Sequence, residues 1–172
     1  MHKLLKILTG VLLGFTAGLA PALGATPKLL GSNRDWDAFT VGDGQEKSCY
    51  IRSAPTKSLP TGVNRGEIFL FVTHRPAGKV QKEVSFISGY PFKPDSSVTA
   101  TVGAQNFTLF TEGDGAWLET PGEDAKLVTA MKKGSTLVIK GISARGTKTT
   151  DNVSLAGFTA AMNSIDKACG VK

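Results

Sequence analysis

The chain is a succession of short apolar stretches separated by turns rich in glycine, proline and aspartate. Eight or nine such stretches can be counted, and each has the length of a β-strand rather than of a helix. Many short strands with turn signals between them are typical of a β-sandwich or a jelly-roll-like barrel. With 172 residues, the chain has room for one domain of this kind.

The clearest strand is the uninterrupted apolar run at residues 68–72, which predicts a strand covered on both faces. We expect residues 25–33 to be a polar lead-in and residues 55–64 to be a loop. The predicted strands lie at residues 36–39, 48–53, 68–72, 84–87, 97–102, 106–111, 116–118, 135–142 and 152–155.

Two helices are expected to pack on these strands. Thr120-Pro121-Gly122-Glu123 has the pattern of a capping box, and Gly134 ends the helix that follows it. A second helix is predicted over residues 157–169, because its apolar residues recur at helical spacing. Such faces are normally buried, so we read both helices as part of the core.

Residues 1–24 have the pattern of a secretory signal peptide. Lys3 and Lys6 precede an uncharged apolar stretch, and small residues that suit cleavage follow it. The alternative is a membrane anchor, but glycines and Pro21 leave the apolar part short for a spanning helix. We therefore expect a single exported domain over residues 25–172.

The chain is basic, with a formal net charge of +6 that falls to +4 once Lys3 and Lys6 are removed with the signal peptide. This excess favours anionic envelope or host-surface groups, proteins or glycans, and allows peripheral association with a membrane. Nucleic acid is a poor candidate partner, because the cations are spread along the chain. Two predicted loops combine cations with turn residues, and they supply our candidate anion-binding residues: Arg75, Lys79, Lys82, Arg145 and Lys148. The hypothesis is that folding brings the two loops together as one basic face, and the alternative is two separate solvated loops.

Cys49 and Cys169 are the only cysteines. In an oxidising compartment such a pair predicts a disulfide that ties an early strand to the C-terminal helix. A free reactive thiol is the alternative. Neither a Cys-x-x-Cys pair nor the ligand spacing of a zinc site occurs in the sequence.

The sequence offers no recognisable catalytic arrangement. His74 is the only histidine after the signal peptide, and a lone histidine is most often at the surface or hydrogen-bonded. No Gly-x-Ser-x-Gly turn is present to provide a nucleophile. We therefore expect a binding or structural protein rather than an enzyme, with no metal and no cofactor.

Three stretches together resemble the invasion-associated locus B family of Gram-negative bacteria, and the resemblance covers roughly residues 34–170. They are Arg75-Pro76 with Glu83-Val84-Ser85-Phe86 and Gly89-Tyr90-Pro91-Phe92, then Ala116-Trp117 with the helix ending Ala130-Met131-Lys132-Lys133-Gly134, and finally Ser143-x-Arg145-Gly146-Thr147-x-Thr149-x-Asp151-x-x-Ser154-Leu155-x-Gly157-Phe158. Turn chemistry accounts for the last stretch, with Asp151 expected to brace a turn through backbone amides.

This resemblance implies a protein exported to the periplasm or the outer cell envelope, where it has a binding or structural role. The founding members of the family are linked to bacterial entry into red blood cells, so the alternative is a virulence-associated surface adhesin or invasion factor acting on host cells. No biochemical activity is established for the family. No catalytic residue is therefore carried over to this chain.

Overall fold

The structure is a computed structural model and describes residues 25–171. The predicted signal peptide lies outside the described residues, and none of the helices within them is long and apolar enough to cross a membrane. The elements are β1 Lys28–Asn33, β2 Trp36–Val41, the 3-10 turn Gly44–Glu46, β3 Ser48–Ser53, β4 Lys57–Leu59, β5 Phe69–Arg75, β6 Val80–Ile87, β7 Ser97–Val102, β8 Gln105–Glu112, β9 Gly115–Trp117, α1 Pro121–Lys133, β10 Thr136–Ile142, β11 Lys148–Ser154 and α2 Phe158–Cys169.

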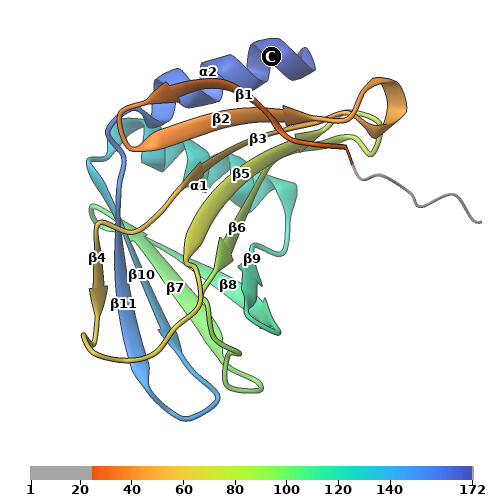
Figure 1. Cartoon of the computed structure of the whole chain (residues 1–172). Helices are drawn as coiled ribbons and strands as arrows, with labels where there is room; N and C mark the ends of the chain where they lie inside the picture. Colours follow the sequence, from red (N-terminus) through yellow and green to blue (C-terminus); the bar gives the residue numbers. More distant parts are fainter. Residues whose placement is uncertain (1–24, 172) are drawn as a thin grey trace, which may run out of the picture.

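The eleven strands of the described part form one antiparallel sheet in the order β1-β2-β3-β5-β6-β9-β8-β7-β10-β11-β4. The two end strands, β1 and β4, each have one neighbour, so the sheet is open and not a closed barrel. The sheet is strongly bent, so that β2, β3 and β5 run across the direction of β7, β10 and β11 (Figure 1). The predicted mainly-β domain with two packed helices is confirmed, and its bent sheet is consistent with a sandwich.

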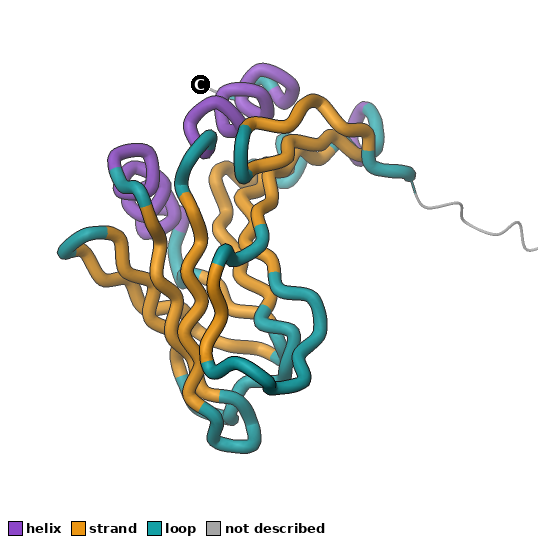
Figure 2. Tube along the Cα trace, turned by 60° about the vertical axis from the view of Figure 1, so that its left-hand side comes forward, coloured by secondary structure: helices purple, strands orange, loops and turns teal. Residues whose placement is uncertain are grey.

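The core lies between the helices and one face of the sheet. Trp36 of β2 and Phe158 of α2 are fully buried, and their rings meet edge to face with centroids 5.0 Å apart. The indole Nε1 of Trp36 donates to the carbonyl of Ser154 at 2.9 Å, which satisfies its one polar atom. Figure 2 shows the C-terminal helix lying against the strands at the top of the view.

Both predicted helices are confirmed. The Thr120 hydroxyl accepts from the backbone N–H of Glu123 at 3.3 Å, as the capping box requires. The predicted disulfide is also present and joins Cys49 of β3 to Cys169 of α2. At the start of α2, Gly157 has φ +89° and lies so close to the β1–β2 turn that a Cβ would be 1.8 Å from the carbonyl oxygen of Asn33.

Two predictions about the chain before β5 are wrong. Residues 25–33 are not only a lead-in, because Lys28–Asn33 pairs with β2 as an edge strand. The turn between these strands has Arg34 at φ +55°, whereas glycine or asparagine usually marks such a turn in a sequence. The predicted loop at residues 55–64 contains β4, which pairs with β11 but is too short to show an alternating pattern.

The apolar run that forms β5 is covered on one face rather than on both. Leu70 and Val72 are 1% and 0% exposed on the face that meets the helices. Phe69 and Phe71 point to the opposite face and remain half-buried. The expectation of a strand covered on both faces is therefore wrong for the outer face.

Candidate functional site

A buried ion pair marks the region where the loop before β5 meets β11. The two Nη atoms of Arg65 donate to the two carboxylate oxygens of Asp151 at 2.8 and 2.9 Å. The side chains are only 7% and 1% exposed. Arg65 also donates from Nε and Nη2 to the carbonyl of Ser88, at 3.1 and 2.8 Å. This bidentate arginine–carboxylate pair fixes the loop before β5 on the sheet.

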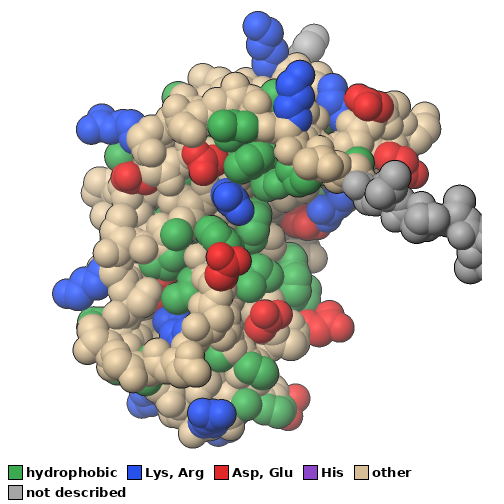
Figure 3. Space-filling view, viewed as in Figure 1, with side chains coloured by type: hydrophobic (Ala, Val, Ile, Leu, Met, Phe, Trp, Pro, Cys, Tyr) green, Lys and Arg blue, Asp and Glu red, His purple; other side chains and the backbone are tan. Residues whose placement is uncertain are grey.

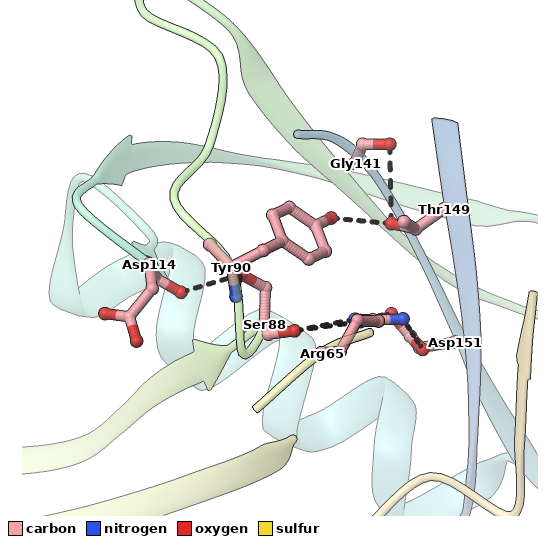
Figure 4. A network of polar contacts seen from close by, with 7 residues as sticks. All are labelled: Arg65, Ser88, Tyr90, Asp114, Gly141, Thr149 and Asp151. Carbon is pink, nitrogen blue, oxygen red and sulfur yellow. Dashed lines mark hydrogen bonds and ion pairs between the residues drawn. The ribbon is translucent and has the colours of Figure 1, made fainter. Parts of the chain in front are cut away.

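Tyr90 extends this network toward the β10–β11 hairpin (Figure 4). Its ring stacks on the Arg65 guanidinium, whose central carbon lies 4.8 Å from the ring centroid. Its hydroxyl oxygen lies 2.6 Å from Oγ1 of Thr149. The Thr149 hydroxyl in turn donates to the carbonyl oxygen of Gly141 at 3.5 Å. Burial raises the pKa of Tyr90 above its ordinary value, which keeps the phenol neutral.

Glycines and a serine hold the chain that presents Tyr90. Gly89 has φ +71°, and a Cβ on it would lie 2.5 Å from the carbonyl oxygen of Gly66, so only glycine suits this position. The hydroxyl of Ser88 is within hydrogen-bond distance of the carbonyls of Tyr90 and Asp114, at 2.6 and 3.0 Å. Gly141 leaves space for the tyrosine, because a Cβ there would lie 3.1 Å from its hydroxyl oxygen. Local structure thus explains the glycine and the tyrosine of the Gly-Tyr-Pro-Phe stretch.

Beside this network the surface has a hollow of about 500 Å³, which we call the hairpin hollow. It is lined by Val63, Asn64, Arg65, Gly89, Tyr90, Pro91, Ser143, Ala144, Arg145, Thr147 and Thr149. None of these described residues is acidic, and Asp151 behind the wall is already paired with Arg65. The exposed Arg145 therefore gives the hollow a cation without a counter-charge in its lining.

The five cations that were predicted from the sequence to bind anions lie in two separate places in the structure. Arg145 lines the hairpin hollow, and Lys148 is exposed at the start of β11 on the same hairpin. Arg75, Lys79 and Lys82 belong to the β5–β6 hairpin, which lies at the opposite end of the molecule from the β10–β11 hairpin (Figure 1). The two loops therefore do not form one shared basic face.

One cation of the β5–β6 hairpin has a counter-charge. Arg75 forms an ion pair with Glu83.

The backbone N–H of Lys82 donates to Nδ1 of His74 at 3.0 Å, and Nε2 of that histidine lies 2.8 Å from a carboxylate oxygen of Asp166. His74 is fully buried, so it is the hydrogen-bonded kind of histidine rather than a surface one. Burial lowers its pKa, and the backbone donor leaves the ring proton on Nε2.

Two members of the network were not identified from the sequence. Asp151 was expected to brace a turn, but it lies within β11 and pairs with Arg65 instead. Its position alternates with Thr149 and Val153, so it faces inward, and a buried carboxylate that stays charged needs a charged partner. Arg65 itself lies in a loop, where no pattern marks it as buried.

Comparison with protein families matches residues 36–166 to the model of the invasion-associated locus B (IalB) protein family. That span includes the buried ion pair, the Gly-Tyr-Pro-Phe stretch and the β10–β11 hairpin. Comparison with curated proteins and with solved structures gave no significant match. The family model covers most of the chain and reaches from β2 into α2, so this chain belongs to the invasion-associated locus B family.

Proposed function

We propose that this chain is an exported protein of the bacterial envelope that binds an anionic partner at the hairpin hollow. The partner is an acidic glycan or an acidic protein surface in the envelope. Family membership supports an envelope role, and the hollow supplies a place to bind. The site works by recognition rather than by catalysis, and its central residue is Arg145.

The observation that supports an anionic ligand is the unbalanced charge of the hollow. Arg65 is neutralised by Asp151, whereas Arg145 is exposed and shares the lining with the polar residues Asn64 and Thr147. A guanidinium beside polar side chains suits the oxygens of a carboxylate, sulfate or phosphate group. The Arg65–Tyr90 network makes part of the lining rigid, so the ligand meets a formed site.

The test compares two charge-matched variants, Arg145→Gln in the hollow and Lys79→Gln at the far hairpin. Each is assayed for retention on isolated envelope fractions and on host-cell membranes as salt is raised. We expect Arg145→Gln to weaken retention about tenfold at low salt, the value of a charged hydrogen bond, while Lys79→Gln leaves it near the wild-type level. Equal retention of all three proteins at low salt would eliminate the hollow as the site.

The same site could serve an adhesin that meets host cells, and the two roles differ in location. An adhesin has to reach the outer surface, whereas an envelope factor does not. Protease treatment of intact cells separates them: we expect the chain to be protected until the outer membrane is opened. Digestion on intact cells would instead support the invasion role. Intact mass from an exporting host tests the cleavage near residue 24 in the same preparation.

A further inference from the structure

The outer face of the sheet, opposite the helices, has a row of aromatic side chains around one arginine. We call it the aromatic band, and it consists of Phe39, Tyr50, Arg52, Phe71, Trp117 and Phe110. These residues are half-buried except Phe110, which is 42% exposed. Figure 3 shows hydrophobic side chains gathered over β2, β3 and β5 with a cation among them.

Strand register places these side chains in two groups on one face, with Ser85 of β6 between Phe71 and Trp117. Phe39 is paired with Tyr50, Arg52 with Phe71, and Phe110 with Trp117. Residues directly opposite in an antiparallel pair point to the same face of the sheet. At the β1 end, Leu29 is paired with Phe39 and is 53% exposed, so the apolar surface continues to the edge.

The arginine of the band is held by rings rather than by a carboxylate. The Arg52 guanidinium lies 5.0 Å from the ring centroids of both Phe39 and Phe69. It belongs to neither of the two arginine–carboxylate ion pairs among residues 25–171. Its cross-strand neighbour Asp37 accepts instead from the Ser32 hydroxyl at 2.6 Å. Arg52 is thus positioned by rings and forms no ion pair within the described part of the chain, with the Asp37 carboxylate opposite it on the same face of the sheet.

Local structure keeps the band open and rigid. The six-membered part of the Trp117 indole covers Gly115, where a Cβ would lie 2.1 Å from Cη2. The rings of Phe39 and Tyr50 stack with centroids 5.1 Å apart, and those of Phe110 and Trp117 stack at 5.9 Å. Contacts of this kind order the side chains before a partner arrives, which lowers the entropy lost on binding.

We propose that the aromatic band is a docking surface for a segment of a partner protein that presents apolar side chains around a carboxylate. Buried aromatic residues and arginine are the groups that dominate protein–protein binding energy, and Arg52 on β3 lies one strand in from the β2 end of the row. From β2 to β8 the band crosses five strand spacings, about 24 Å at the usual spacing. An amphipathic helix of about 16 residues has this length. This surface is separate from the hairpin hollow.

The test uses three synthetic helical peptides of about 16 residues that share one apolar face and differ only at one position about one turn from an end of that face, with Glu, Gln or Lys there. Binding is followed by acrylamide quenching of tryptophan fluorescence. Trp36 is fully buried, so a change in quenching reports on Trp117 in the band. We expect the Glu peptide to protect Trp117 and to bind about tenfold more tightly than the Gln peptide, with the Lys peptide weakest.

Arg52→Gln is expected to bind the Glu and Gln peptides equally, while the matched variant Lys140→Gln, outside the band on β10, keeps the tenfold preference. Circular dichroism checks that both variants fold. Equal binding of the Glu and Gln peptides to the wild-type chain would overturn the proposal. So would protection of Trp117 by phosphatidylcholine–phosphatidylglycerol vesicles but by none of the peptides, or protection by self-association at rising protein concentration.

Discussion

Replacing Arg65 by methionine is the sharpest test of the buried network. Methionine keeps an apolar stem against the Tyr90 ring but removes the guanidinium. Asp151 then stays in a site where its side chain is 1% exposed, without the two hydrogen bonds that satisfied its charge. The carbonyl of Ser88 loses its two donated bonds as well.

The expected cost follows from this burial. Removing one partner of a buried ion pair typically costs about 3–5 kcal/mol, because the remaining charge is uncompensated. In a domain of this size, about 1 kcal/mol shifts the melting temperature by roughly 2–4 °C, so Arg65→Met should lower it by roughly 6–20 °C. The double variant Arg65→Met with Asp151→Leu should recover most of the loss, since neither charge remains.

The assay is urea unfolding of the disulfide-intact protein, followed by circular dichroism and tryptophan fluorescence. Arg145→Met is the matched control, because that arginine is exposed and its loss should change the unfolding free energy by less than about 0.5 kcal/mol. A cost below about 1 kcal/mol for Arg65→Met, or a double variant no more stable than the single one, would refute the reasoning.

Three further predictions concern single positions. Burial raises the pKa of Asp124 from 3.8 to about 6. The contribution of this group to stability is therefore full below pH 3.8 and is lost as the pH rises through 6. Asp124→Asn should remove on the order of 3 kcal/mol from the pH dependence of the unfolding free energy between pH 4 and 7, measured against wild type. Gly157→Ala should cost more than about 2 kcal/mol in urea unfolding, because its Cβ would meet the carbonyl of Asn33, and a wild-type midpoint would contradict the close approach. The unreduced protein should have no alkylatable thiol by mass spectrometry, and reducing the Cys49–Cys169 bond should lower the unfolding free energy by about 2–5 kcal/mol; two alkylatable thiols in freshly isolated protein would contradict the bond.

The sequence predicts those parts of this fold that depend on local chemistry. The helix that follows Thr120 begins and ends where its cap and its terminal glycine indicate. The disulfide was predicted from two cysteines together with the predicted signal peptide. Strand β1 could not be predicted, because Arg34 occupies a turn position that gives no signal in the sequence.

The two candidate sites depend on long-range contacts, and this limits what a sequence reveals. Arg65 and Asp151 are far apart in the chain and meet only because the loop before β5 returns to β11. The same limit applies to the candidate anion-binding cations. Charge and turn residues mark Arg75 and Arg145 equally in the sequence, and only the topology shows that their hairpins lie at opposite ends of the molecule (Figure 1). The apolar run of β5 led to a prediction of burial on both faces. A run of apolar residues does not show whether a second layer of structure covers the face that carries Phe71, and in this fold that face is only half-buried.

In the proposed function, the hairpin hollow is the surface that meets an envelope partner. Photo-crosslinking in intact cells tests it most directly, with the reactive side chain placed at Ala144 in the hollow or at Lys79 on the far hairpin. Our account predicts a discrete crosslinked envelope component from Ala144, lost when Arg145→Gln is added, and none from Lys79. The same product from both positions, or a product from Lys79 alone, would contradict it.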